Sequence, residues 1–167
     1  MNLGKKIVIV GVSASGKSVF GRALAQRTSI PLTHMDTIWW KAGWVETSEE
    51  EATEKLGSIT TSSEWIVEGY IPKDARPFVF ERADTIIYLD YSGSTAAWRY
   101  VKRWWKHRKQ ARPELEGSPE KFSFKFLKLV WTKGEAKSLN LFLSQVKNKE
   151  KIIILQTPSE AEALLRK

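Results

Sequence analysis

Short runs of aliphatic and β-branched residues recur along the chain and predict strands. The clearest run covers residues 6–10, which read Lys-Ile-Val-Ile-Val, and it ends at Gly11. A run with no polar alternation is typical of a strand buried on both faces of a parallel sheet. Shorter runs of the same kind predict further strands at residues 31–35, 65–67, 85–89 and 152–155.

Apolar residues at helical spacing fill the stretches between these runs. They predict a helix over residues 18–27. Ser48 followed by Glu51 forms a capping box, which predicts a helix that reaches about residue 60. Further helices are predicted at residues 95–110, 122–131 and 139–146, and from an N-cap at Ser159 to residue 165.

The predicted helix over residues 95–110 has three large apolar side chains on one face. These are Trp98, Val101 and Trp105, and cations occupy the other faces. We expect the tryptophan face to lie in the core because an apolar stripe normally packs inward. The stretch from Gln110 to Pro119 is rich in Pro, Glu and Gly and predicts a loop.

The order of these elements predicts the α/β class. Strands that alternate with helices form βαβ units, so we expect a five-stranded, mostly parallel sheet with helices on both faces. A chain of 167 residues favours one domain spanning residues 1–167. No apolar run approaches the roughly 20 residues that cross a bilayer, no secretory signal is recognisable and there is no cysteine. We therefore expect a cytoplasmic protein with no membrane partner.

Residues 11–18 read Gly-Val-Ser-Ala-Ser-Gly-Lys-Ser and match the phosphate-binding pattern G-x-x-x-x-G-K-[ST] between a strand and a helix. The glycines allow the loop to curl so that its amides face phosphate oxygens. Lys17 can reach the β- and γ-phosphates and the Ser18 hydroxyl can bind Mg²⁺. ATP and Mg²⁺ are thus the expected cofactors. The predicted nucleotide-binding residues here are Gly11, Ser13, Ala14, Ser15, Gly16, Lys17 and Ser18.

Charge is distributed unevenly along the chain. Residues 1–90 hold 10 Lys and Arg against 12 Asp and Glu, whereas residues 91–167 hold 17 against 7. The second part is therefore strongly basic. This asymmetry indicates a polyanionic partner or a solvated basic helix face, and composition alone favours neither.

The chain resembles the adenylate-kinase-like branch of the P-loop kinases, and within it the bacterial DNA topology modulation proteins. The resemblance covers nearly the whole chain. The segments that carry it are residues 11–18, His34-Met35-Asp36 with Trp40, and residues 41–44, 65–69, 83–90, 112–114 and 117–122 with Phe126 and Trp131. It implies a P-loop NTPase fold with a short lid. The group usually has Asp-Gly-Asn where this chain has Glu68-Gly69-Tyr70.

The positions that carry the family resemblance and the ends of the predicted strands together indicate an acceptor site. We expect a substrate segment at about residues 36–64, in which Asp36 accepts a proton from the substrate or binds its hydroxyl, although a turn residue is the alternative. Trp40 could stack on the acceptor or only pack beneath it. Gly69 and Tyr70 follow the third strand and are expected beside the acceptor. Glu68, which ends that strand, would hold Mg²⁺ through water.

Arginines follow Asp90 at the spacing seen in adenylate kinases. Arg99 and Arg103 lie nine and thirteen residues after it and share a helix face. The resemblance implies that both contact the phosphates and stabilise the transferring charge, together with Lys17. A lid at about residues 108–119 would bring Arg108 and Arg112 to the substrate. Thr157, after the fifth strand, is placed by the resemblance near the adenine, and His34 is expected to be structural.

These residues predict a Mg²⁺- and ATP-dependent phosphotransferase. Its acceptor would be a nucleotide or another small hydroxylated or phosphorylated molecule, and neither the acceptor nor the oligomeric state is fixed by the sequence. One alternative is a nucleotide-dependent regulator that binds nucleic acid through cations interleaved with Trp98, Tyr100, Trp104 and Trp105. The expected burial of Trp98 and Trp105 counts against it. Another alternative is an ATPase without a dedicated acceptor.

Overall fold

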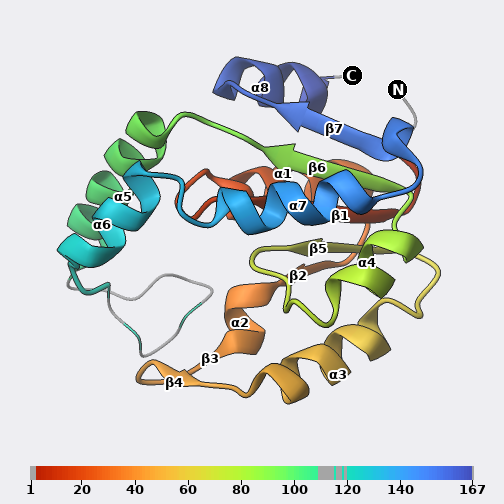
Figure 1. Ribbon diagram of the computed structural model, residues 1–167, viewed down its shortest axis with the longest axis horizontal. Coiled ribbons are helices and arrows are strands. Elements are labelled where there is room, and N and C mark those ends of the chain that lie inside the picture. Colours follow the sequence, from red (N-terminus) through yellow and green to blue (C-terminus); the bar gives the residue numbers. More distant parts are fainter. Residues whose placement is uncertain (1–2, 109–114, 116–117, 119, 167) are drawn as a thin grey trace.

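A parallel five-stranded sheet forms the centre of the computed structural model, which describes residues 3–108, 115, 118 and 120–166 (Figure 1). Its strand order is β2-β5-β1-β6-β7, and each neighbouring pair is parallel. The strands are β1 (Lys6–Gly11), β2 (Leu32–His34), β5 (Trp65–Glu68), β6 (Thr85–Leu89) and β7 (Ile152–Leu155). The predicted α/β class and all five predicted strands are confirmed, with ends that agree to within one residue.

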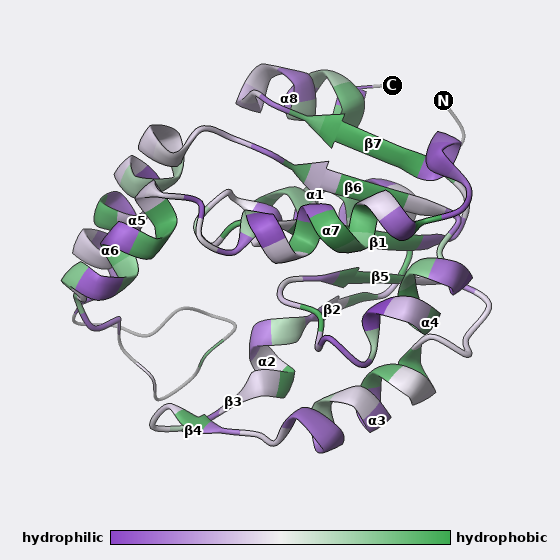
Figure 2. Ribbon diagram, in the orientation of Figure 1, coloured by the Kyte–Doolittle hydropathy of each residue, from purple (hydrophilic) through white to green (hydrophobic). Residues whose placement is uncertain are grey.

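Helices cover both faces of the sheet because successive strand residues point to opposite sides. Val8 and Val10 of β1 pack into one buried cluster with residues of α3 (Glu49–Ile59), α4 (Arg76–Arg82) and α7 (Ala136–Gln145). Ile7 and Ile9 of the same strand pack into a second cluster with α1 (Lys17–Thr28) and α8 (Pro158–Arg166). Figure 2 shows hydrophobic residues along β6 and β7.

The predicted substrate segment folds into α2 (Met35–Trp39), a hairpin of β3 (Trp40–Lys41) and β4 (Val45–Glu46), and α3. Ser48 caps α3 as expected, since its hydroxyl accepts from the Glu51 amide at 3.2 Å. The hydrophobic pattern did not predict α2, the hairpin or α4. These elements are too short to show a periodic pattern.

The predicted orientation of α5 (Gly93–His107) is wrong. Trp98 is 67% exposed and Trp105 is 62% exposed, whereas Ala96, Ala97 and Tyr100 are buried. The small Ala96 packs with Val12 of the loop after β1 and with Val130 of α6 (Phe124–Trp131). A close approach to that loop needs small side chains, so the bulky tryptophans face outward.

The N-cap predicted for the last helix is also wrong. Ser159 lies inside α8, which begins at Pro158, and the Glu160 amide donates to the Thr157 hydroxyl at 3.3 Å. Proline is favoured at the first position of a helix because its missing N–H would have no partner there. Ser159 follows the residue that fixes the start of the helix.

Most of the predicted lid at residues 108–119 lies outside the described residues. Of those described, Leu115 and Ser118 are buried, and the Ser118 hydroxyl accepts from the Gly43 amide of the β3–β4 turn at 3.1 Å. The helices α6 and α7 follow the lid segment in the chain, and a 3₁₀ turn η1 (Lys149–Lys151) follows α7. Within the described part of the chain, no helix combines the length and apolarity needed to cross a bilayer.

Candidate nucleotide and acceptor site

The loop between β1 and α1 has the curled backbone that an anion-binding loop requires. Gly11, Ala14 and Gly16 have positive φ angles of 154°, 62° and 97°. A Cβ on Gly16 would lie 2.6 Å from a guanidinium nitrogen of Arg99. The helix α1 begins at Lys17, so its free N-terminal amides and the positive end of its dipole face the same space.

Lys17 folds back over this loop. Its Nζ donates to the carbonyls of Gly11 and Val12, both at 3.0 Å. Burial lowers the pKa of Lys17, while the carboxylates of Glu68, Glu135 and Asp36 act in the opposite direction. The ammonium group therefore lies where an arriving phosphate would replace neutral carbonyls as its partner.

A cavity of about 1220 Å³ opens in front of the loop. One end is lined by loop and α1 residues, including Gly11, Ser13, Gly16, Lys17 and Ser18. The other end is lined by Asp36, Trp40, Trp44, Gly69 and Tyr70, and residues of α5 close one side. The volume exceeds the usual range of about 300–1,000 Å³ for one small ligand, so two ligands could lie end to end.

The second end of the cavity is assembled from α2, the hairpin and the turn after β5. Trp40 and Trp44 meet edge to face with ring centroids 5.5 Å apart. The Trp39 indole N–H donates to the Tyr70 carbonyl at 2.8 Å, which joins the two segments. Gly69 is required at the crossing, since a Cβ there would lie 2.7 Å from the Met35 Cβ and its φ is 129°.

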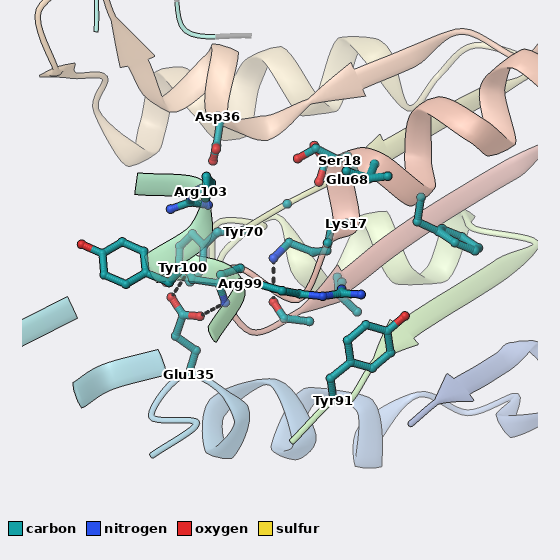
Figure 3. Close-up of a pocket in the computed structure, with 18 of the residues that line it drawn as sticks. Lys17, Ser18, Asp36, Glu68, Tyr70, Tyr91, Arg99, Tyr100, Arg103 and Glu135 are labelled. Atoms are coloured by element: carbon teal, nitrogen blue, oxygen red, sulfur yellow. Dashed lines mark hydrogen bonds between the residues drawn. The ribbon is translucent and has the colours of Figure 1, made fainter. Parts of the chain in front are cut away.

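Both predicted arginines of α5 line the cavity (Figure 3). Arg99 donates to the Ser15 carbonyl at 2.5 Å, and its guanidinium lies 5.0 Å from the centre of the Tyr91 ring. Arg103 forms an ion pair with Glu120, with Nε and Oε1 3.1 Å apart. The structure thus brings Lys17, Asp36, Arg99 and Arg103 to one cavity, and their catalytic roles stay predictions.

Ser18 and Glu68 offer the oxygen ligands that Mg²⁺ prefers. Both line the cavity, and the Glu68 side chain lies against Gly21, one turn along α1 from Ser18. Glu68 is 2% exposed, and its Oε1 is 2.5 Å from Nδ1 of His34. A hydroxyl and a carboxylate beside a phosphate-binding loop fit a magnesium ion whose remaining ligands are phosphate oxygens and water. His34, expected to be structural, orients this carboxylate.

Three predicted residues lie outside the cavity lining. Ser15 is buried in the phosphate-binding loop, and its carbonyl accepts from Arg99. The Arg108 guanidinium lies 3.8 Å from the centre of the Trp105 ring on the exposed side of α5. Thr157 caps α8, although its neighbour Pro158 does line the cavity. The proposed contacts of Arg108 with the acceptor and of Thr157 with the adenine stay predictions, and Arg112 is not among the described residues.

Sequence reasoning missed Glu135 and Arg76. The Glu135 carboxylate accepts from the Ser13 amide at 2.7 Å and from the Ser13 hydroxyl at 3.0 Å. Arg76, at the start of α4, is 4% exposed and lines the acceptor end of the cavity. Neither belongs to a local motif, because the partners of Glu135 lie 122 residues away in the chain.

Solved structures of two kinases and of one further protein share this fold. A shikimate kinase from Bacteroides thetaiotaomicron matches with a TM-score of 0.60 and 17% identity, over 96% of this chain and 93% of that one. A gluconokinase from Sinorhizobium meliloti matches with a TM-score of 0.57 and 17% identity, over 99% and 90%. The YorR protein from Bacillus subtilis, solved with phosphorylated GDP, matches with a TM-score of 0.59 and 11% identity, over 96% and 91%.

No family model and no curated protein sequence matches the chain. The matches to the shikimate kinase and the gluconokinase, both at 17% identity, show that the fold is that of P-loop kinases. The predicted P-loop fold is thereby confirmed.

Proposed function

We propose that this protein is a Mg²⁺- and ATP-dependent phosphotransferase that acts on a small hydroxylated acceptor. One observation supports this above all: the phosphate-binding loop and a separate wall of polar and aromatic side chains line the same cavity. A protein that only binds a nucleotide has no need of the second wall. The fold shared with solved kinases agrees with the proposal.

Charged side chains from both ends of the cavity take part in the proposed transfer. The acceptor hydroxyl attacks the γ-phosphorus, the bond to the ADP oxygen breaks, and Asp36 takes the hydroxyl proton. Lys17, Arg99 and Arg103 meet the negative charge that spreads over the transferring group. Mg²⁺ bound near Ser18 and Glu68 would neutralise phosphate charge. Lys17 exchanges its bonds to loop carbonyls for bonds to phosphate.

We also propose a narrower family assignment for the chain. The spacing from Asp90 to Arg99 and Arg103 and the segments given above support an adenylate-kinase-like enzyme of the DNA topology modulation group. A nucleotide acceptor would follow from that kinship. The structural matches to kinases named for shikimate and gluconate indicate that other small acceptors also deserve testing.

A screen of small metabolites for acceptor-dependent ADP release tests the function directly. We expect a small set of hydroxylated compounds to stimulate release in wild type, and Lys17→Met to abolish it. ATP binding by calorimetry should weaken in Lys17→Met, while Lys55→Met, an exposed α3 residue paired with Glu51, should match wild type. Unchanged ATP binding in Lys17→Met would refute the phosphate-loop assignment. ADP release that no compound stimulates would instead favour the ATPase alternative.

A nucleic-acid-binding regulator is a second candidate, because the observation that counted against it does not hold. Trp98 and Trp105 are exposed on α5 beside exposed Lys102 and Lys106. Exposed aromatic rings among cations can stack on bases and contact the backbone. A salt series with single-stranded and duplex DNA separates the candidates. Micromolar or tighter binding with a steep salt dependence, weakened by Trp98→Ala, would support it.

A further inference from the structure

Arg76 is a buried cation at the acceptor end of the cavity whose protein partners are all neutral. Its Nε donates to the Ile71 carbonyl at 3.1 Å, and one terminal nitrogen donates to the Ser138 hydroxyl at 2.9 Å. The guanidinium lies 5.3 Å from the centre of the Tyr70 ring and 4.8 Å from that of Phe142. Among the residues that the structure describes, no carboxylate lies within ion-pair distance of it.

The absence of a paired carboxylate is unusual for so buried a charge. Burial lowers the pKa of Arg76, and an arginine nevertheless stays protonated at neutral pH. Glu49 is the carboxylate that acts on it through space, and that side chain is exposed and already accepts from the Lys73 amide at 2.8 Å. A buried charge without a counter-ion costs free energy, so such groups normally have a partner of opposite sign.

The two arginines of α5 that line the cavity do not share this arrangement. Arg103 has Glu120 as an ion-pair partner, and Arg99 lies at the nucleotide end, against the Ser15 carbonyl. Arg76 alone among these three is held by α4 at the acceptor end. A guanidinium carries five N–H groups, and within the described part of the chain two of those on Arg76 donate to protein acceptors.

We propose that Arg76 binds an anionic group of the acceptor, so that the acceptor is a carboxylate or phosphate compound with a free hydroxyl. This inference rests on the proposed function. Asp36 lines the same end of the cavity and would repel an anion. Asp36 therefore contacts the hydroxyl of the acceptor, and Arg76 binds its negative group. The pair thus orients the acceptor. A neutral analogue would leave the guanidinium buried and unpaired and should bind about 10- to 100-fold more weakly.

The test uses compound pairs that differ in charge, added to the full chain saturated with ADP and Mg²⁺. The pairs are adenosine 5′-monophosphate with adenosine, D-gluconate with D-glucitol, and shikimate with its methyl ester. Thermal unfolding ranks the compounds and calorimetry gives their dissociation constants. We expect at least one anion to stabilise wild type where its neutral partner does not. The pair that responds separates a phosphate from a carboxylate acceptor.

Substitutions then assign the preference to Arg76. Arg76→Gln should raise the dissociation constant of the preferred anion by about 10- to 100-fold and that of its neutral partner little. Ser138→Ala removes a hydrogen bond of Arg76 but keeps its charge, so the preference should persist. Arg82→Gln is the matched control, because that guanidinium lies on the Phe78 ring of the same helix but outside the cavity lining. Arg76→Lys should lose part of the preference.

Each failure has its own signature. If wild type does not bind ADP, the proposed function fails. If ADP binds and no anion is preferred over its neutral partner, or if Arg76→Gln keeps the preference, the anion subsite is overturned and the proposed function stands. ADP binding also shows whether a variant is folded. If Arg76→Gln does not bind ADP, Arg76→Lys takes its place, and an undiminished preference of Arg76→Lys for the anion over its neutral partner would overturn the subsite.

Discussion

At one end of the cavity the phosphate-facing surface is largely backbone from residues 11–18, whereas the other end is built from side chains of distant segments. The loop amides are aimed by local conformation, with positive φ angles at Gly11, Ala14 and Gly16. The acceptor end joins α2, the turn after β5 and the start of α4, through contacts such as Trp39 to the Tyr70 carbonyl. The first end therefore depends on a few glycines and the second on tertiary packing.

This difference determines which residues can vary at each end of the cavity. A triphosphate presents the same oxygens to every P-loop, so a fixed backbone cradle suits it. An acceptor is recognised by side chains whose type can change without disturbing the loop. Substitutions at the two ends should accordingly fall into two classes, one that changes nucleotide binding and one that changes turnover or acceptor choice.

The largest effect should come from Arg103 of α5, which lines the cavity together with Lys17 and Asp36 (Figure 3). Arg103→Gln removes a cation that we place on the transferring phosphoryl group, and turnover should fall by about 10³-fold or more. ADP binding by calorimetry should change little, because the loop keeps its amides and Lys17. Arg166→Gln, an 82% exposed arginine at the end of α8, is the control and should behave as wild type. Equal losses in turnover and ADP binding would place Arg103 at the nucleotide end alone.

A smaller effect is expected at the carboxylate beneath the loop. Glu68→Gln keeps the size of the side chain and its contact with His34 but removes the charge that would hold Mg²⁺ through water. Metal affinity should fall about 10- to 100-fold, measured as the Mg²⁺ concentration that gives half-maximal turnover. Glu64→Gln, near the start of the same strand and 41% exposed, should leave that concentration unchanged. An unaltered Mg²⁺ dependence in Glu68→Gln would mean that the carboxylate only supports His34.

The sequence predicted the nucleotide end well because its determinants are local. The strand, the loop pattern and the helix that starts at Lys17 are contiguous, and the structure has all three. Much of the acceptor end could not be predicted, since Arg76 enters the cavity on a short helix whose seven residues show no periodicity. Glu135 reaches Ser13 across 122 residues, and no spacing rule links them.

The error at α5 has a different physical origin. Hydrophobicity placed Trp98 and Trp105 in the core, but the helix packs through Ala96, Ala97 and Tyr100. Contact distance decided the orientation, since α5 must come close enough for Arg99 to reach the Ser15 carbonyl. The side of a helix that approaches a functional loop can thus be its least bulky side, and hydropathy alone does not reveal this.

A comparison of two glycines measures the strain in the loop. Gly16→Ala places a Cβ on a residue with φ of 97° and only 2.6 Å from Arg99, so it should lower the free energy of unfolding by about 1–2 kcal/mol and weaken ADP binding. Gly57 lies within α3, and a Cβ there meets no atom within 4 Å. Gly57→Ala should raise stability by about 0.5–1 kcal/mol. Urea unfolding measures the stability of both variants. If Gly16→Ala raised the free energy of unfolding as Gly57→Ala does, the assignment of strain to the loop would be contradicted.

The smallest effect concerns how the cavity sets the charge of Lys17. Burial lowers the pKa of this lysine, so its proton is lost, and ATP affinity falls, at a pH below the ordinary lysine value of 10.5. Glu135→Gln keeps an oxygen for the Ser13 amide but removes a charge that raises this pKa, so the fall should move to lower pH. Calorimetry across alkaline pH measures the shift, with Glu54→Gln on the exposed surface of α3 as the control. Lys17→Met should show no such fall, and if it persists there, another group titrates. Tyr91 is a poor candidate for that group, since burial raises its pKa and moves its titration to higher pH.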